Sequence, residues 1–115
     1  MEAEDVEFSN RIKILREKYV FNDVEAVEYF VRTHRMVAPF LIEAAPQFAA
    51  AFGDQAPLAL EIMPDDEAPH SIYALAIWDG EGAEARSALR IFDEGWLARN
   101  FQAINGRIVF DYELI

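Results

Sequence analysis

Hydrophobic residues in the first half of the chain recur with the period of an α-helix. Their spacing predicts a helix over about 6–19 that buries one face, formed by Phe8, Ile12, Leu15 and Tyr19. Asn22 and Glu25 have the spacing of a capping box, so we expect a second helix to start there. Because proline restricts the residue before it, Pro39 predicts a break near 33–38 and a third helix from about Pro39 onward.

The second half of the chain changes to the pattern of a β-sheet. Apolar residues alternate over 58–63, fill both faces of 71–78 and alternate again over 107–115. A helix over about 83–98 separates the last two strands. The fold class predicted is therefore α+β, with three N-terminal helices followed by β-β-α-β and a three-stranded, mostly antiparallel sheet.

This pattern is expected to form a single domain over 1–115, with a helical half over 1–53 and a β-β-α-β half over 54–115. The short connection between the first two strands makes them antiparallel. The last strand either lies beside the second strand through a right-handed crossover or lies beyond the first strand. We favour the second arrangement, because small α+β domains favour antiparallel pairing.

Composition and charge narrow the functional classes. The chain is 53% hydrophobic and has no cysteine, which predicts an ordinary core without disulfides or thiolate metal sites. Its net charge of −11 disfavours binding to phosphate backbones and to anionic membrane surfaces. No apolar stretch approaches the roughly 20 residues that span a bilayer. We therefore expect a cytoplasmic protein that binds neither nucleic acid nor membrane.

The acidic residues are concentrated in one segment. Residues 54–82 contain seven acidic residues and no Lys or Arg, so they supply −7 of the net charge of −11. Such a segment either forms a solvated surface or binds a basic partner or a cation. Its loop at Asp65, Asp66 and Glu67 is the first candidate partner-binding site.

Four segments of the chain occur together in a known group of proteins. They are Leu60-Glu61-Ile62, the acidic loop Pro64–Glu67, the block Phe92–Leu97 and the final Gly106–Glu113. In these segments the chain resembles a group of small uncharacterised bacterial proteins over about 28–113. The group commonly has a second Trp where this chain has Gly95. The resemblance implies a compact bacterial domain and no particular activity or cofactor.

Three carboxylates stand out of phase with the apolar residues of the strands. Glu61 lies in the first strand, and Asp111 and Glu113 lie in the last. If those strands are neighbours, the three side chains share one sheet face, where like charges are destabilising. A hard cation such as Mg²⁺ or Ca²⁺ would neutralise them. The alternatives are solvation, or contact with a basic helix or partner, for example through Arg32, Arg35, Arg86 or Arg90.

The block Phe92–Leu97 supplies a second candidate partner site, at Asp93, Glu94 and Trp96. Trp is common at interface hot spots. In the alternative interpretation, Phe92 and Trp96 belong to the core and the two acids are solvated. Gly95 lies within the expected helix, where it costs about 1 kcal/mol relative to Ala. It therefore either permits close approach of another backbone or ends the helix early.

No catalytic constellation is apparent. His34 and His70 are the only histidines, and neither has a second ligand at metal-binding spacing. The chain also lacks a nucleophile elbow, a Ser/His/Asp set and a phosphate-binding glycine loop. The sequence therefore favours a non-enzymatic interaction or accessory module whose acidic face binds a basic protein. The alternatives are a metal-dependent phosphoester hydrolase using Glu61, Asp111 and Glu113, and a homodimer formed through a sheet edge or the Trp-bearing helix.

Overall fold

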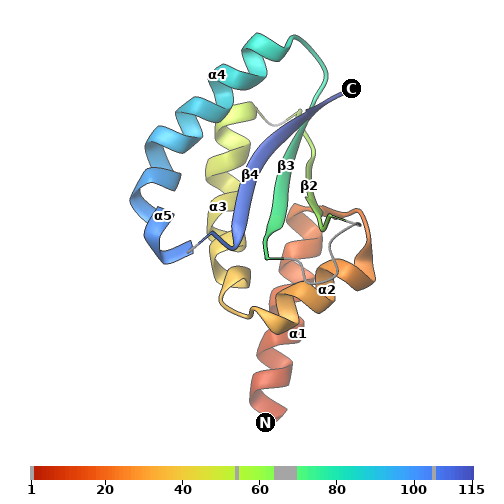
Figure 1. Cartoon of the computed structure of the whole chain (residues 1–115). Coiled ribbons are helices and arrows are strands. Elements are labelled where there is room, and N and C mark those ends of the chain that lie inside the picture. The colour runs from red at the N-terminus through yellow and green to blue at the C-terminus, as the bar shows by residue number, and fades with distance from the viewer. Residues whose placement is uncertain (1, 54, 64–69, 105) are drawn as a thin grey trace.

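A computed structural model describes residues 2–53, 55–63, 70–104 and 106–115 (Figure 1). Its helices are α1 (Glu2–Lys18), α2 (Val24–Thr33), α3 (Val37–Phe52), α4 (Gly82–Phe92) and α5 (Ala98–Ile104). Its strands are β1 (Val20–Phe21), β2 (Leu58–Glu61), β3 (Ile72–Trp78) and β4 (Ile108–Leu114). The α+β class predicted from the sequence is confirmed.

The sheet has four strands in the order β1-β2-β3-β4, rather than the three expected. β2 and β3 are antiparallel, as predicted, but β4 lies parallel beside β3. The arrangement that we favoured, with the last strand beyond the first, is therefore wrong, because the helices between β3 and β4 return the chain to the start of β3. The extra strand, β1, pairs parallel with β2 through Val20–Ala59 and Phe21–Leu60.

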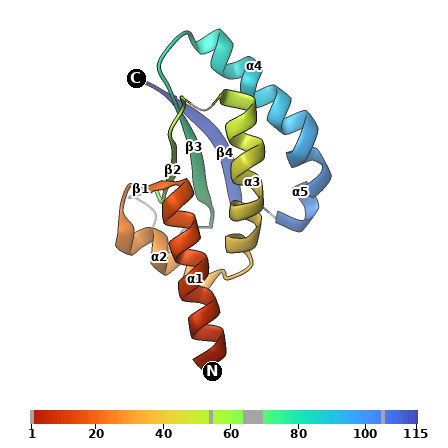
Figure 2. The same cartoon turned by 180° about the vertical axis from the view of Figure 1, so that it is seen from behind.

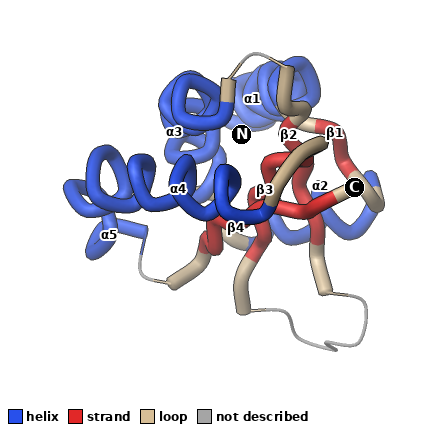
Figure 3. Tube along the Cα trace, turned by 90° about the horizontal axis from the view of Figure 1, so that it is seen from above, coloured by secondary structure: helices blue, strands red, loops and turns tan. Residues whose placement is uncertain are grey.

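The helices are distributed unevenly around the sheet. Seen from behind in Figure 2, α1 and α3 lie across one face. Helix α4 runs along the β4 side, and α2 lies at the end where β3 and β4 begin (Figure 1). The view from above in Figure 3 shows α1 and α3 on the same side of the sheet. The core therefore fills the space between one face of the sheet and these helices.

Aromatic rings form the centre of this core. The ring centroid of Phe48 on α3 lies 4.8 Å from that of Phe92 and 5.4 Å from that of Phe110. The side chains of Ile72, Ala74 and Ala76 on β3 are fully buried against the same cluster. Since α4, α3 and β4 each supply one of the central rings, the two halves of the sequence share one core.

Helix α1 is held to the core by a buried polar contact and two arginines. The hydroxyl of Tyr19, directly after the helix, donates a hydrogen bond of 2.8 Å to the carbonyl oxygen of Leu41. Near the other end of α1, the guanidinium groups of Arg32 and Arg35 lie 5.5 Å and 5.0 Å from the ring centroid of Phe8. These two arginines cover a Phe side chain that is only 7% exposed.

Several helix boundaries differ from those expected. The N-cap of α2 is Asp23, whose carboxylate accepts a hydrogen bond of 3.2 Å from the backbone N–H of Ala26, so Asn22 is not the cap. Helix α3 starts at Val37 and continues through Pro46. The single helix expected over 83–98 extends through α4 and α5, with a π-helical turn at Asp93–Leu97 between them.

Candidate functional site

The sheet face opposite α1 and α3 has no helix over it in the described part of the chain. Figure 1 looks directly onto this face. Strand register places on it Val20, Ala59, Glu61, Tyr73, Leu75, Ile77, Val109, Asp111 and Glu113. We call these nine positions the open sheet face. None of them is Lys, Arg or His.

An apolar strip runs along the middle of the open sheet face. Tyr73, Leu75 and Ile77 project from β3, and the strip is flanked by Ala59 on β2 and Val109 on β4. Leu75 is 7% exposed and Ala59 3%, although neither belongs to the main core cluster. The remaining apolar members are partly buried, apart from the exposed Val20.

The three strand carboxylates flank this strip instead of meeting. Glu61 pairs with Tyr73, and Asp111 pairs with Leu75, so β3 separates Glu61 from Asp111. Two strand spacings amount to about 9.6 Å, whereas Ca²⁺ ligands lie only about 2.4 Å from the ion. The expectation that the strands of Glu61 and Asp111 are neighbours was wrong. Among the described residues, no group of three His, Cys, Asp or Glu side chains is placed to hold a metal ion.

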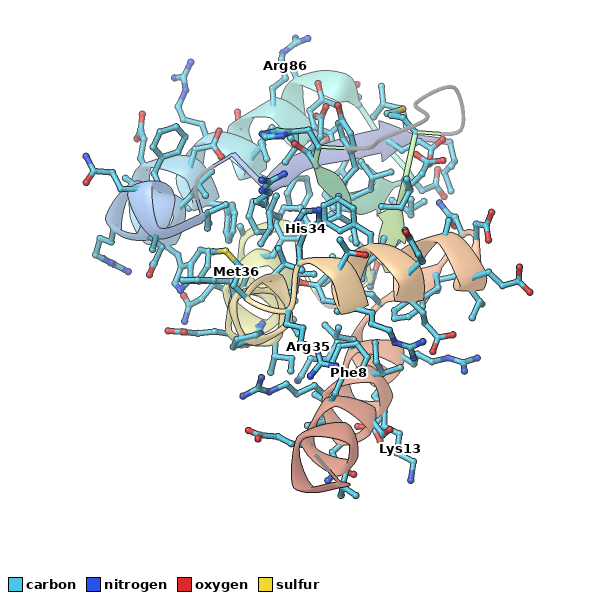
Figure 4. The ribbon with its side chains drawn as sticks, turned by 60° about the horizontal axis from the view of Figure 1, so that its bottom comes forward. Phe8, Lys13, His34, Arg35, Met36 and Arg86 are labelled. Atoms are coloured by element: carbon cyan, nitrogen blue, oxygen red, sulfur yellow. The ribbon has the colours of Figure 1, made fainter. Side chains whose placement is uncertain are left out.

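Two of the four arginines considered as counter-charges contact Phe8 instead of the sheet carboxylates. Arg32 and Arg35 stack on Phe8, and Figure 4 shows Arg86 pointing outward from α4. The one ion pair between described residues joins Arg11 Nη2 and Glu7 Oε1 at 2.9 Å on α1. The carboxylates of the open sheet face therefore have no salt-bridge partner within the described part of the chain.

Helix α4 and strand β4 bring a further carboxylate to this side of the molecule. Asp93 begins the π-helical turn, and its pKa is raised, first by burial and then by the negative charges of Asp111 and Glu94. The Asp111 carboxylate is oriented by a hydrogen bond of 2.8 Å that its Oδ1 accepts from the backbone N–H of Tyr112. Negative charge is thus concentrated along β4 without compensation from described neighbours.

Trp96 belongs to the core and is not an exposed partner contact. It is 6% exposed, and its ring centroid lies 5.7 Å from that of Phe92 and 6.1 Å from that of Phe110. Its carbonyl oxygen accepts a hydrogen bond of 2.8 Å from the side-chain amide of Asn100. Gly95 neither ends the helix nor permits a close backbone approach, because a Cβ placed on it would have no neighbour within 4 Å.

A cleft of about 660 Å³ adjoins one end of the open sheet face. Its walls come from the end of α3, the start of β2 and the end of β3, and comprise Phe52, Gly53, Gln55, Ala56, Pro57, Ile77, Trp78, Asp79 and Ile115. Ile77 belongs both to the cleft and to the apolar strip. The indole Nε1 of Trp78 is buried and has no hydrogen-bond partner within the described residues. The cleft therefore has an apolar wall that includes Phe52, Ile77 and Trp78.

The structure also brings together three residues that sequence reasoning kept apart. His34 lies at the C-cap of α2, His70 just before β3 and Arg107 just before β4. Arg107 and His70 form a side-chain hydrogen bond of 3.0 Å, and both affect the pKa of His34. No motif spacing signals this cluster, because it depends on the pairing of β3 with β4.

The loop residues Asp65, Asp66 and Glu67, proposed as partner contacts, lie outside the described residues.

Comparisons with known proteins supply no family or relative for these sites. No protein-family model, no curated protein and no solved structure matches the chain. In the described residues, no helix combines the length and the apolar character needed to cross a membrane. The function proposed below therefore rests on the geometry and charge of the described residues alone.

Proposed function

We propose that the chain is a non-enzymatic interaction module whose open sheet face binds a basic, amphipathic segment of a partner protein. One observation carries this proposal: the apolar strip Tyr73-Leu75-Ile77 is flanked by carboxylates on both sides, and none of the nine positions of the open sheet face is basic. A segment with aliphatic residues on one side and Lys or Arg along its edges complements that surface. Burial of the partly exposed Tyr73 and Ile77, beside the already buried Leu75, would provide affinity, and charge would provide orientation and a faster approach.

The arrangement of like charges supports a partner-binding role. Asp111 and Glu113 lie two residues apart on the same face of β4, and the charge of Asp111 also opposes ionisation of Asp93. A basic partner would relieve this repulsion. The association would then weaken with added salt, because partly exposed charges are screened.

The cleft beside Ile77 supports the same proposal. Binding energy at interfaces is concentrated in a few side chains that enter well-packed pockets. A segment lying along β3 would reach the cleft at Ile77, where Phe52 and Trp78 provide aromatic walls. One large apolar side chain of the partner would fit there as an anchor.

A basic partner fits this face better than a second copy of the chain. In a two-fold symmetric contact, the same patch from each copy meets its equivalent. The carboxylates of Glu61, Asp111 and Glu113 would then face carboxylates. The hydrolase alternative requires those three residues around one ion, and the described structure does not bring them together.

The proposal is tested with a short helical peptide that carries Leu on one side and Lys on its edges. The double variant Asp111→Lys and Glu113→Lys should weaken peptide binding about tenfold and flatten its salt dependence, because two attractions become repulsions. The control variant, Glu17→Lys with Glu43→Lys, makes the same change in net charge at exposed sites on α1 and α3. Equal weakening in both variants would show only general charge attraction and would contradict a specific face.

A further inference from the structure

His70 and Arg107 meet at the end of the sheet where β3 and β4 begin, and the charge of Arg107 also acts on His34 at the C-cap of α2. Figure 4 shows His34 between α2 and the strands. Arg107 Nη1 lies 3.0 Å from His70 Nδ1 and donates a hydrogen bond of 3.2 Å to the His70 carbonyl oxygen. Ser71 Oγ donates a bond of 2.6 Å to the Gly106 carbonyl oxygen, which ties the two strand starts together. The cluster is therefore fixed by pairing of β3 and β4.

Several donors of this cluster make no hydrogen bond to any described residue. An arginine side chain has five N–H donors and no acceptor. The contacts of Arg107 with other described residues use Nη1, and within the described part of the chain its Nε and Nη2 make no hydrogen bond. Because arginine can only donate, His70 Nδ1 accepts in this contact, and the neutral ring carries its proton on Nε2. His70 therefore presents a second N–H donor.

His34 completes the cluster from α2. Its backbone N–H donates to the Phe30 carbonyl oxygen at 2.8 Å, and its ring lies 4.6 Å from the Phe30 ring, which restrains the side chain. Burial is the main cause that lowers the pKa of His34, and the positive charge of Arg107 lowers it further. The other basic groups near it on the chain, Arg32 and Arg35, stack on Phe8.

We propose that His34, His70 and Arg107 form a binding site for a phosphate-class oxyanion. An oxyanion would take two parallel hydrogen bonds from the free edge of the Arg107 guanidinium, as arginine commonly provides to phosphate. The imidazole N–H of His70 would supply a further donor. A metal cation is disfavoured here, because Arg107 occupies His70 Nδ1 and is itself positively charged. The three residues are not among the nine positions of the open sheet face, so neither proposal depends on the other.

The chain offers a direct assay, because His34 and His70 are its only histidines. Inorganic phosphate is titrated while the imidazole C–H resonances are followed by NMR at constant ionic strength. Both histidines should shift along one saturable curve. A parallel titration with glycerol 2-phosphate distinguishes free phosphate from an esterified phosphate group as the preferred ligand. The site is contradicted if neither anion produces a saturable shift at both histidines.

Variants and pH provide the controls. Arg107→Gln should weaken phosphate binding about tenfold or more, because charge-assisted hydrogen bonds are lost. Arg107→Lys keeps the charge and should weaken binding less. It therefore distinguishes loss of the binding site from misfolding of the Arg107→Gln variant. Arg35→Gln removes an equal charge from the Phe8 stack and should leave binding unchanged.

Sulfate, whose charge is constant near neutral pH, should bind more tightly as the pH falls and His34 becomes protonated. Sulfate binding that is independent of pH, or equal losses in Arg35→Gln and Arg107→Gln, would overturn the assignment.

Discussion

Asp93 in the π-helical turn and Asp111 on β4 lie close enough for the charge of Asp111 to raise the pKa of Asp93. Burial of Asp93 acts in the same direction and is the larger cause. The turn and the strand therefore place two carboxylates close together beside the open sheet face. The native state is less stable when both carboxylates are ionised. This is the kind of local cost that a basic partner would remove.

Replacing Asp93 should show that cost. Because its pKa is raised in the folded state, the native protein holds a proton that the unfolded chain has released, so stability falls as pH rises through the window above the usual carboxyl pKa. Asp93→Asn should therefore be more stable than the parent at neutral pH, with the advantage disappearing in acid. Thermal melts across this pH range test the prediction, with Glu43→Gln on α3 as the exposed control. A variant that loses stability at neutral pH would contradict it.

The Tyr19 hydroxyl should contribute to stability through the Leu41 carbonyl. Tyr19→Phe leaves that buried oxygen without its partner and should cost about 1–2 kcal/mol of unfolding free energy. Tyr29 is 72% exposed, so Tyr29→Phe should change stability by less than about 0.5 kcal/mol. Chemical denaturation of the two variants gives the comparison, and equal effects would argue against the contact. Burial also raises the pKa of Tyr19, so the hydroxyl stays protonated well into the alkaline range.

Trp96 should behave as a core residue. Trp96→Ala should cost about 3–5 kcal/mol, because it empties a space between Phe92 and Phe110. Phe101 is 65% exposed on α5, and Phe101→Ala should have little effect on unfolding free energy. If Trp96→Ala retained full stability while losing peptide binding, the core assignment would be incorrect and the partner-contact alternative would return.

Replacing either of two glycines by alanine should change the unfolding free energy, but in opposite directions. A Cβ on Gly80 would lie 2.8 Å from Trp78 Nε1, so Gly80→Ala must displace the indole and should cost about 1–3 kcal/mol. A Cβ on Gly95 would meet nothing within 4 Å, and Gly95→Ala should stabilise the helix by about 0.5–1 kcal/mol. Denaturant midpoints of the two variants check both signs. Destabilisation by Gly95→Ala would indicate that the π-helical turn requires glycine.

The elements with regular periodicity were predictable from the sequence. The apolar face of α1, with Ile12 and Leu15 buried, and the alternation in β2 and β4 follow from local spacing. The strand β1 was missed because two residues have no measurable period. The π-helical turn was missed because it changes a local hydrogen-bond pattern without changing the character of the residues around it.

The candidate sites depended on contacts that local patterns do not contain. Glu61, Asp111 and Glu113 do share one face, as alternation predicted, but the position of β4 separates them. The meeting of His70 with Arg107, 37 residues later, follows from the same strand order. One misplaced strand therefore accounts both for the expected metal cluster and for the missed basic cluster.

The central claim, that the open sheet face binds a basic amphipathic segment, is tested most directly by mapping the Leu/Lys peptide on the chain with backbone amide NMR. Saturable shifts should be concentrated on β2, β3 and β4, centred at Leu75 and extending to Ile77 at the cleft, with α1 and α3 unaffected. Shifts spread over the acidic residues of all helices, or confined to α1, would contradict the claim.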